Sequence, residues 1–306
     1  MAYPTPQVTK TTAATFIPEI WSDEVVAAYK KHLVAANLFK KMSFKGKKGD
    51  TVNIPSPTRG AASVKAASTA VTLIAATETN IPVLIDKHYE YSRFIEDIVE
   101  VQALSSLRRF YTDDAGYSLA KQIDTDMVQL GRTFNSGAAT AAYTGGYAGG
   151  DGTTAYVAAN NNQSALTDAA IRRTIQRLDD NDVPTDGRFF MIPPSARNTL
   201  MGLDRYTAMD FVGEAGNANT IRNGQIGNLY GMPVYVTSNC DTTSGSAAAR
   251  VALMGHKDAA VLVEQLGIRS QTQYKQDYLS TLYTSDTIYG VKELRDNSAF
   301  ALVVPA

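Results

Sequence analysis

Residues 104–134 read LSSLRRFYTDDAGYSLAKQIDTDMVQLGRTF. Apolar side chains recur in this run every three or four residues, at Leu104, Leu107, Tyr111, Ala115, Leu119, Ile123, Met127, Leu130 and Phe134. Side chains return to one face of an α-helix with this period, and the signal is the strongest of its kind in the chain. The pattern predicts one long amphipathic helix from about Asp97 to Arg132. Gly116 costs the helix about 1 kcal/mol relative to alanine but does not break the period.

Two extended runs precede this helix. In the first, Val52 and Ile54 alternate with polar residues after a Gly-Asp turn, and the second covers residues 79–86. Residues 60–77 between them are too rich in small side chains to form a core alone. We expect residues 45–86 to form a long β-hairpin that projects from the body. An isolated two-stranded ribbon is marginally stable in water, so the surface that it lies on should belong to another copy.

The N-terminal residues 1–15 contain almost no large apolar side chains and are expected to form a flexible arm. They also lack the apolar core of a secretory signal. A short amphipathic helix should follow, capped by Ser22 and extending to about Leu38.

Beyond the long helix, a glycine-rich tract leads into alternating helix and strand signals. We expect a helix capped by Thr167, a strand at 188–192 and a helix capped by Ser195, followed by strands near 233–237 and 251–254. This order predicts an α/β region. Residues 287–294 and 299–304 are expected to form a C-terminal β-hairpin around the turn Arg-Asp-Asn-Ser.

Composition excludes several classes of protein. The chain has 306 residues, 44% of them hydrophobic, and no run of uncharged apolar residues long enough to span a membrane. The net charge is −1, from 29 basic and 30 acidic residues, which argues against a dedicated nucleic-acid binder. The single cysteine, Cys240, rules out an internal disulfide and a multi-cysteine zinc cluster.

No motif predicts catalysis or metal binding. His32, His88 and His256 are scattered without metal-ligand spacing, and Cys240 has no recognisable base. The glycine-rich run 145–152 lacks the Gly-Lys-Ser/Thr that would make it a phosphate-binding loop. We therefore expect a protein that is not an enzyme, with no cofactor and no metal.

Charge is distributed unevenly along the chain. Residues 1–65 contain ten basic and four acidic side chains, whereas residues 96–126 contain three basic and seven acidic ones. Opposite charges of this kind can attract neighbouring copies. The basic candidates for such an interface are Lys40, Lys41, Lys45, Lys47, Lys48, Arg59 and Lys65, and the acidic ones are Glu96, Asp97, Glu100, Asp113 and Asp114. Asp124 and Asp126 point away from each other on a helix and are expected on a solvated or intersubunit acidic face.

Four motifs, in this order, resemble those of the major capsid proteins of tailed bacteriophages with the Hong Kong 97-type fold. They are GDTVNIP (49–55), RFFMIPPSARNTL (188–200), NGQIGNLYGMPVYVTSN (223–239) and YGVKELR (289–295). The third is the most specific, because Gly227 and Gly231 flank Leu229 as the turn before a strand of the axial domain would require. The resemblance covers nearly the whole chain.

The resemblance implies an α+β fold divided into five parts. These are an N-terminal arm and short helix (1–44), an extended β-hairpin loop (45–86), a peripheral domain with a long spine helix (87–139), an axial α/β domain (140–250) and strands returning to the peripheral domain (251–306). Some relatives cross-link an extended-loop lysine to an asparagine. Lys65 and Asn297 are only loosely placed for this reaction, so we do not expect a cross-link.

The implied function is a self-assembling shell of hexamers and pentamers that encloses double-stranded DNA with weak contacts. The implied partners are other copies of the chain, a separate scaffolding protein and a portal protein, with no membrane involved; the presence of a decoration protein stays open. Synthesis in the host bacterial cytoplasm and a final place in the virion capsid follow. An encapsulin-like nanocompartment shell and a small α/β enzyme remain as alternatives, to be separated by cargo and by assembly state.

Overall fold

The computed structural model describes residues 30, 33–57, 60–74, 78–97, 105–203, 227–245 and 248–306. The long helix is present as α3 (Ser105–Gln129) and continues into the 3-10 turn η2 (Leu130–Arg132). Ala115, Leu119, Ile123 and Met127, each four residues apart, are buried as the periodicity predicted. Residues 98–104, which were expected to belong to this helix, lie outside the described residues.

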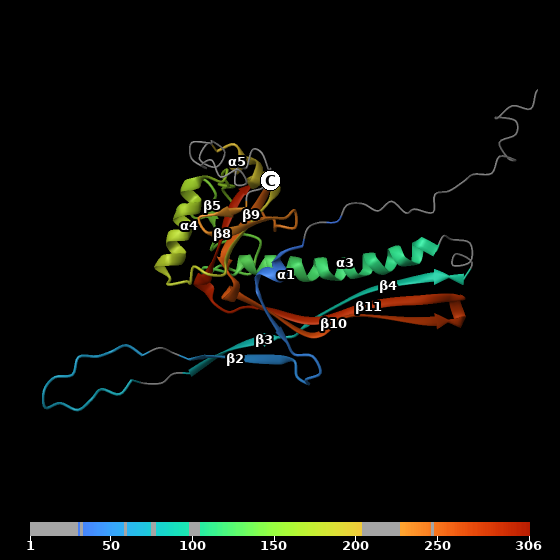
Figure 1. Cartoon of the computed structure of the whole chain (residues 1–306), viewed down its shortest axis with the longest axis horizontal. Helices are drawn as coiled ribbons and strands as arrows, with labels where there is room; N and C mark the ends of the chain where they lie inside the picture. The colour runs from blue at the N-terminus through green and yellow to red at the C-terminus, as the bar shows by residue number, and fades with distance from the viewer. Residues whose placement is uncertain are drawn as a thin grey trace, which may run out of the picture.

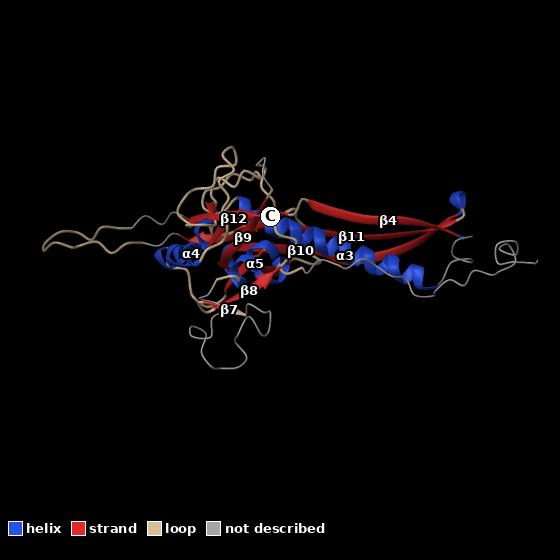
Figure 2. Cartoon of the chain, turned by 90° about the horizontal axis from the view of Figure 1, so that it is seen from above, coloured by secondary structure: helices blue, strands red, loops and turns tan. Residues whose placement is uncertain are grey.

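A four-stranded sheet lies along α3 and gives the molecule its elongated shape (Figures 1 and 2). Its order is β1 (Lys40–Ser43), β10 (Ala260–Lys275), β11 (Ser280–Glu293) and β4 (Lys87–Glu96). β10, β11 and β4 are antiparallel to one another, and β1 pairs with β10 in parallel. The sequence did not predict β1, β4 or β10.

The expected hairpin is present. β2 (Thr51–Pro57) pairs with β3 (Glu78–Leu84) in antiparallel register, as an extension beside the body (Figure 1). Val83 is buried at the base of the hairpin and packs in a small core with Val261 and Val263 of β10. β3 and β11 approach closely there, because a Cβ on Gly290 would lie 2.1 Å from the carbonyl oxygen of Leu84.

The α/β region is built on a six-stranded sheet. Its order is β5 (Tyr147–Ala148), β12 (Ala299–Pro305), β9 (Ala249–His256), β6 (Arg188–Ile192), β8 (Met232–Val236) and β7 (Asn228–Leu229). The helices α4 (Asp168–Asp180) and α5 (Pro194–Met201) belong to this region. The hydroxyl of Thr167 accepts a hydrogen bond from the backbone N–H of Ala170, so the predicted cap of α4 is confirmed.

The prediction of a C-terminal hairpin was wrong. Strands occupy both expected segments, but β11 lies in the four-stranded sheet, whereas β12 pairs with β9 and β5 in the six-stranded sheet. The residues of β12 from Ala299 to Val304 are all buried, a pattern typical of a strand covered on both faces rather than of a surface hairpin. Among the final residues 251–306, β10 and β11 therefore return to the sheet beside α3, while β9 and β12 do not.

Two helix starts also differ from expectation. α5 begins with Pro194 after Pro193, and the Ser195 hydroxyl donates a hydrogen bond to the carbonyl oxygen of Pro305 instead of capping the helix. In the expected N-terminal helix, residues 35–38 form α1 (Ala35–Leu38). The cap Ser22 lies outside the described residues.

The two large sheets share one hydrophobic core. It includes Met127 of α3, Phe189 of β6, Leu262 of β10 and Tyr289 of β11. Phe39, which follows α1, meets the ring of Phe189 edge to face at a centroid distance of 5.1 Å. The C-terminal half of α3 therefore joins the two sheets into one body.

Replacing Met127 with alanine removes a fully buried side chain from this shared core. We expect the free energy of unfolding to fall by about 2–5 kcal/mol. Urea denaturation followed by circular dichroism measures the change. Val64→Ala is the control, because Val64 is fully exposed and its truncation should change stability by less than about 0.5 kcal/mol. Equal stability of the two variants would contradict a core centred on α3.

Candidate assembly interface

Five of the seven predicted basic residues gather in one exposed segment, residues 40–48, formed by β1 and the turn that follows it. Gly46 and Gly49 adopt positive φ angles of 78° and 135°, a conformation that favours glycine and reverses the chain. The side-chain amide of Gln265 donates hydrogen bonds to the carbonyl oxygens of Lys47 and Gly49, at 3.1 and 2.9 Å. β10 thus holds the shape of this basic segment.

Lysines of the basic segment make few contacts inside the chain. The Lys45 ammonium lies 3.7 Å from the carboxylate of Glu264, and that of Lys47 lies 5.4 Å from the centroid of the Phe44 ring. Lys41 donates a hydrogen bond to the side chain of Asn37. Lys40, Lys41, Lys45, Lys47 and Lys48 all remain exposed.

The acidic candidates lie at the other end of the four-stranded sheet and on α3. Asp97 accepts a hydrogen bond of 2.7 Å from the Tyr274 hydroxyl, which raises the pKa of Tyr274. Asp114 accepts one of 3.2 Å from the Tyr91 hydroxyl. Burial raises the pKa of Tyr91, with Asp114 adding to the rise, so both tyrosines remain hydrogen-bond donors at neutral pH. Glu96 and Asp113 are exposed.

The structure does not bring the basic and acidic candidates together within one chain. In the part of the chain that it describes, no ion pair joins the two groups. Lys65 lies on the exposed loop between β2 and β3. Arg59 and Glu100 lie outside the described residues. A contact between the two groups would therefore have to form between copies.

Asp124 and Asp126 are buried, so their assignment to an exposed acidic face was wrong. Asp124 accepts hydrogen bonds from the backbone N–H of Ala36 at 3.2 Å and from the Asn239 amide at 2.9 Å. Asp126 lies 3.0 Å from the Lys87 ammonium and accepts a hydrogen bond of 2.7 Å from the Tyr289 hydroxyl. As two positions on a helix should, they point to different partners.

Burial, reinforced by the hydrogen bond to Asp126, raises the pKa of Tyr289 far above its ordinary value. The Tyr289 hydroxyl therefore stays protonated and remains a donor. Asp124 contacts α1 and the loop after β8 of the six-stranded sheet, and Asp126 contacts β4 and β11 of the four-stranded sheet, so the pair connects α3 to both sheets. Sequence periodicity could not detect this, since every partner except neighbouring Gln122 is distant in the chain.

A second polar network fixes the loop after β8. The Arg132 guanidinium binds both carboxylate oxygens of Asp241, at 2.6 and 2.9 Å, and the Tyr143 hydroxyl donates to the same carboxylate at 2.7 Å. The hydrogen bonds to Asp241 raise the pKa of Arg132, and burial raises that of Tyr143. This bidentate geometry stabilises the junction between α3 and the six-stranded sheet.

Cys240 and the two described histidines make contacts with neighbouring structural elements. Burial raises the pKa of Cys240 to about 12, and its Sγ donates to the carbonyl oxygen of Thr237. His256 contacts the carbonyl oxygen of Asp186 at 2.9 Å, and His88 lies 3.3 Å from Asp286. His32 lies outside the described residues. Among the residues that are described, no cluster of three His, Cys, Asp or Glu side chains could hold a metal ion.

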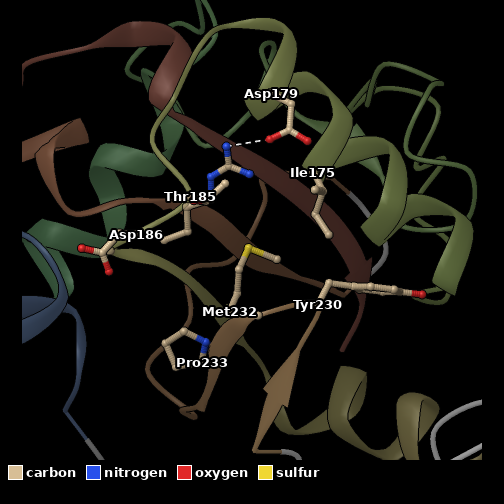
Figure 3. A pocket seen from close by; sticks show the side chains of 10 residues that line it. Ile175, Asp179, Thr185, Asp186, Tyr230, Met232 and Pro233 are labelled. Carbon is tan, nitrogen blue, oxygen red and sulfur yellow. Dashed lines mark ion pairs between the residues drawn. The ribbon is translucent and has the colours of Figure 1, made fainter.

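A cleft of about 720 Å³ lies between α4, the turn before β6 and the β7–β8 turn (Figure 3). Ile175 and Met232 contribute apolar walls, and Tyr230 lines one side. Its charged lining includes the ion pair between Arg188 and Asp179, at 2.7 Å. The remaining polar side chains of the lining are Thr185 and Asp186.

The loop between β2 and β3 carries exposed apolar side chains. Val64 and Leu73 have exposed fractions of 101% and 87%, and Val71 and Ile74 are also exposed. Exposed apolar surface of this kind marks interaction sites. The loop was expected to be too rich in small side chains to form a core alone, and Val71, Leu73 and Ile74 are the large apolar residues that stand close together in it.

Comparison with known proteins identifies the family. The family model described as phage capsid protein matches residues 93–301, about two thirds of the chain. The chain belongs to the phage capsid protein family. A solved chain from Mycobacterium phage Che8 is 26% identical to this capsid protein, with a TM-score of 0.74 over 94% of this chain and 97% of that one. No curated protein sequence matches the chain.

More distant capsids share the fold. The capsid structure of cyanophage P-SCSP1u has a TM-score of 0.75 at 18% identity, over 96% of this chain and 94% of that one. The mature capsid of bacteriophage PhiM1 has a TM-score of 0.70 at 14% identity, over 94% and 92%. The phage capsid protein thus has the Hong Kong 97-type α+β fold that its sequence motifs predicted. Its role is structural, as a major capsid protein of a phage, and neither alternative is supported.

No helix in the described part of the capsid protein is long and apolar enough to cross a membrane.

The buried Asp126 provides a test of the junction. Replacing it with alanine leaves Lys87 and the Tyr289 hydroxyl without their acceptor, and we expect a loss of about 3 kcal/mol in the free energy of unfolding. This is the lower end of the range for buried pairs, because the Lys87 side chain is 30% exposed. Chemical denaturation measures the loss. Asp113→Ala, at an exposed carboxylate of the same helix, should cost less than about 0.5 kcal/mol; similar losses for both variants would disprove the structural role of Asp126.

Proposed function

We propose that this capsid protein assembles into the hexamers and pentamers of an icosahedral shell that encloses the double-stranded DNA of a tailed bacteriophage. The observation that supports this most directly is the β2–β3 hairpin, whose loop residues 60–74 are all exposed and carry large apolar side chains. Exposed to water, these apolar side chains contribute no burial free energy to the single chain. A neighbouring copy would supply the surface that covers it.

The energetics favour contacts between copies. Ordering each residue of the loop costs about 1–2 kcal/mol of backbone entropy, which exposed side chains do not offset. Packing against a neighbour would remove Val64, Val71, Leu73 and Ile74 from water. Hairpin and arm together can bury more than the roughly 1,600 Å² of a standard interface.

The proposed domains follow the two sheets. Residues 1–44 act as the arm and 45–86 as the extended loop. Residues 87–139 form the peripheral domain around α3, together with β10 and β11 from residues 251–306. The axial domain comprises residues 140–250 and the six-stranded sheet, which also includes β12.

The proposed partners are further copies, a scaffolding protein during assembly, a portal protein and a decoration protein. The subunit would be made in the host bacterial cytoplasm, would carry no catalytic site or cofactor, and would act only within the virion. A net charge of −1 suits a wall that encloses DNA with weak contacts, because strong phosphate binding would resist packaging and release.

The proposal predicts the assembly state of the purified protein. We expect pentamers and hexamers, or closed shells, alone or with the scaffolding protein. Analytical ultracentrifugation and negative-stain electron microscopy measure this directly. A strictly monomeric protein at high concentration, even with the scaffolding protein present, would contradict the proposed function.

Removing the loop should separate folding from assembly. Replacing residues 60–74 with two glycines deletes exposed side chains and leaves β2, β3 and the hairpin base intact. We expect a near-normal circular dichroism spectrum and melting temperature, while the yield of shells falls at least tenfold. A second variant keeps the loop length but replaces Val64, Val71, Leu73 and Ile74 with serine. We expect it to lose most of the shell yield as well, because these side chains would make the proposed contact. Normal shells from both variants would refute the role of the loop.

We also propose that the basic segment attracts the acidic residues of a neighbouring copy and sets the register of assembly. Exposed pairs contribute only about 0.2–1 kcal/mol each, and salt screens them over about 10 Å at 0.1 M. Because the same ion pairs would recur at every interface of the shell, their small free energies would add up. Lys47 and Lys48 are the best residues to test, because Lys45 already lies beside Glu264 of its own chain.

Reversing Lys47 and Lys48 to glutamate should slow assembly several-fold at low salt, because like charges would then meet at the interface. Reversing Asp113 and Asp114 to lysine in the same chain should restore part of the rate. Light scattering at two salt concentrations follows both effects. Unchanged rates, or no rescue by the second reversal, would show that the two groups face solvent in the shell.

A further inference from the structure

The sheet beside α3 has four strands only near its base. β1 covers β10 from Val261 to Glu264, and the turn after β1 covers Gln265. Farther along, β11 pairs with one side of β10 as far as Lys275. No strand within the described residues pairs with the other side there. Every residue of β10 from Ile268 to Tyr274 is exposed, so this stretch is an open sheet edge.

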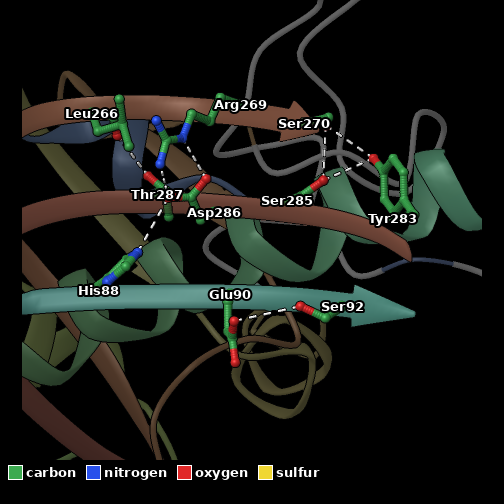
Figure 4. Close-up of polar contacts among 10 residues, drawn as sticks. All are labelled: His88, Glu90, Ser92, Leu266, Arg269, Ser270, Tyr283, Ser285, Asp286 and Thr287. Carbon is green, nitrogen blue, oxygen red and sulfur yellow. Dashed lines mark hydrogen bonds and ion pairs between the residues drawn. The ribbon is translucent and has the colours of Figure 1, made fainter. Parts of the chain in front are cut away.

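Within the described residues, this edge lacks the features that usually protect one. Proteins blunt sheet edges with bulges, free charges or covering segments. The register shifts in β10 lie before Arg269, and from Arg269 onward the pairing with β11 is regular. The guanidinium of Arg269 is held by Asp286 of β11, at 2.7 and 2.9 Å, and Ser270 contacts Ser285 at 2.8 Å (Figure 4). Regular, unpaired backbone N–H and C=O groups can accept another strand.

The sequence of this edge is complementary to itself. An antiparallel pair centred on Gln271 places Ile268 opposite Tyr274, Arg269 opposite Gln273, and Ser270 opposite Thr272. Ile268 and Tyr274 are 45% and 48% exposed in the single chain, and pairing would cover both at each end. A β-branched side chain opposite an aromatic one is a favourable cross-strand pair.

Neighbouring registers fit less well. A pair centred on Thr272 places Arg269 opposite Lys275, and like charges directly opposite each other are destabilising. A pair centred on Ser270 leaves Ile268 opposite Thr272 and places Lys275 opposite Gln265, a position that the turn after β1 already covers. Only the register through Gln271 matches the apolar residues and separates the charges.

The symmetry of this pair of β10 strands is compatible with the wall of a closed shell. Edge-to-edge antiparallel pairing of identical strands requires a two-fold axis perpendicular to the sheet. That axis keeps α3 on the same face of the joined sheet in both copies. A shell with distinct inner and outer surfaces needs this orientation of neighbouring subunits, so the argument rests on the proposed function.

We propose that residues 268–274 of β10 form an isologous interface, in which two copies of the chain join their sheets edge to edge about a two-fold axis at Gln271. The partner is a second copy of this chain, and the contact consists of backbone hydrogen bonds flanked by two Ile268–Tyr274 pairs. The sheet of each copy thus continues into that of its partner.

Disulfide trapping tests the register. In Gln271→Cys, the two copies of the new thiol face each other with Cα atoms about 4.5–5.5 Å apart, within the range of a disulfide. In the matched control Gln273→Cys, the two thiols are offset by four residues, or about 13 Å along the strands, and cannot join. Native Cys240 is buried, so the unmodified chain provides the background. The proteins are oxidised at assembly concentration, and particles and free subunits are then separated by sedimentation.

Non-reducing gels of both fractions give the result. We expect most of the Gln271→Cys chain in particles to run as a dimer, at least fivefold more than for Gln273→Cys. Particles without a Gln271→Cys dimer, or with equal dimer in both variants, would overturn the proposal while leaving the shell function intact. If no particles form, the proposed function fails. The interface is then tested on the free subunits: a disulfide at position 271 but not at 273 supports it, and any other result overturns it.

Discussion

Two buried carboxylates, two residues apart on α3, hold the architecture together. Asp124 binds the α1 backbone and the loop after β8, and Asp126 binds Lys87 of β4 and Tyr289 of β11. A helix directs positions i and i+2 to different sides, so one turn of α3 can contact the edges of two sheets. Met127, the next residue along the helix, packs into the core that both sheets share. Phe39, which follows α1, adds a second contact across the same core through the ring of Phe189.

Because α3 and the two sheets bury the main core among themselves, the remaining elements can extend away from it. β2 and β3 continue away from the small core at Val83, and the outer half of β10 continues beyond β1 with both faces exposed. Neither extension contributes to the shared core. In the proposed shell, neighbouring copies would cover both extensions and offset their cost in entropy and exposed apolar surface.

How far the sequence predicts this structure depends on whether the partners of a segment are local. Periodicity located α3, alternation located β2 and β3, and a capping threonine located the start of α4, because each signal lies within a few turns of chain. The outer half of β10 has no such signal, since Arg269, Gln271 and Gln273 on one face are as polar as Ser270 and Thr272 on the other. β12 was assigned to the wrong partner because a short turn after β11 suggested a hairpin, whereas its fully apolar sequence required burial between β5 and β9. The roles of Asp124 and Asp126 were missed for the same reason, as their partners come from distant parts of the chain. For the candidate interface, the lysines of residues 40–48 were evident in the sequence and are exposed in the structure, whereas the exposure of Val64 and Leu73 became evident only in three dimensions.

Hydrogen exchange measured by mass spectrometry on free subunits and on assembled shells tests the division between body and extensions most directly. The account predicts slow exchange for β6, β9 and β12 in both states, because these strands lie in the closed core. Peptides covering residues 60–74 and 268–275 should exchange rapidly in the free subunit and become at least tenfold slower in the shell. Equal exchange of these peptides in the two states would contradict the claim that neighbouring copies complete the fold.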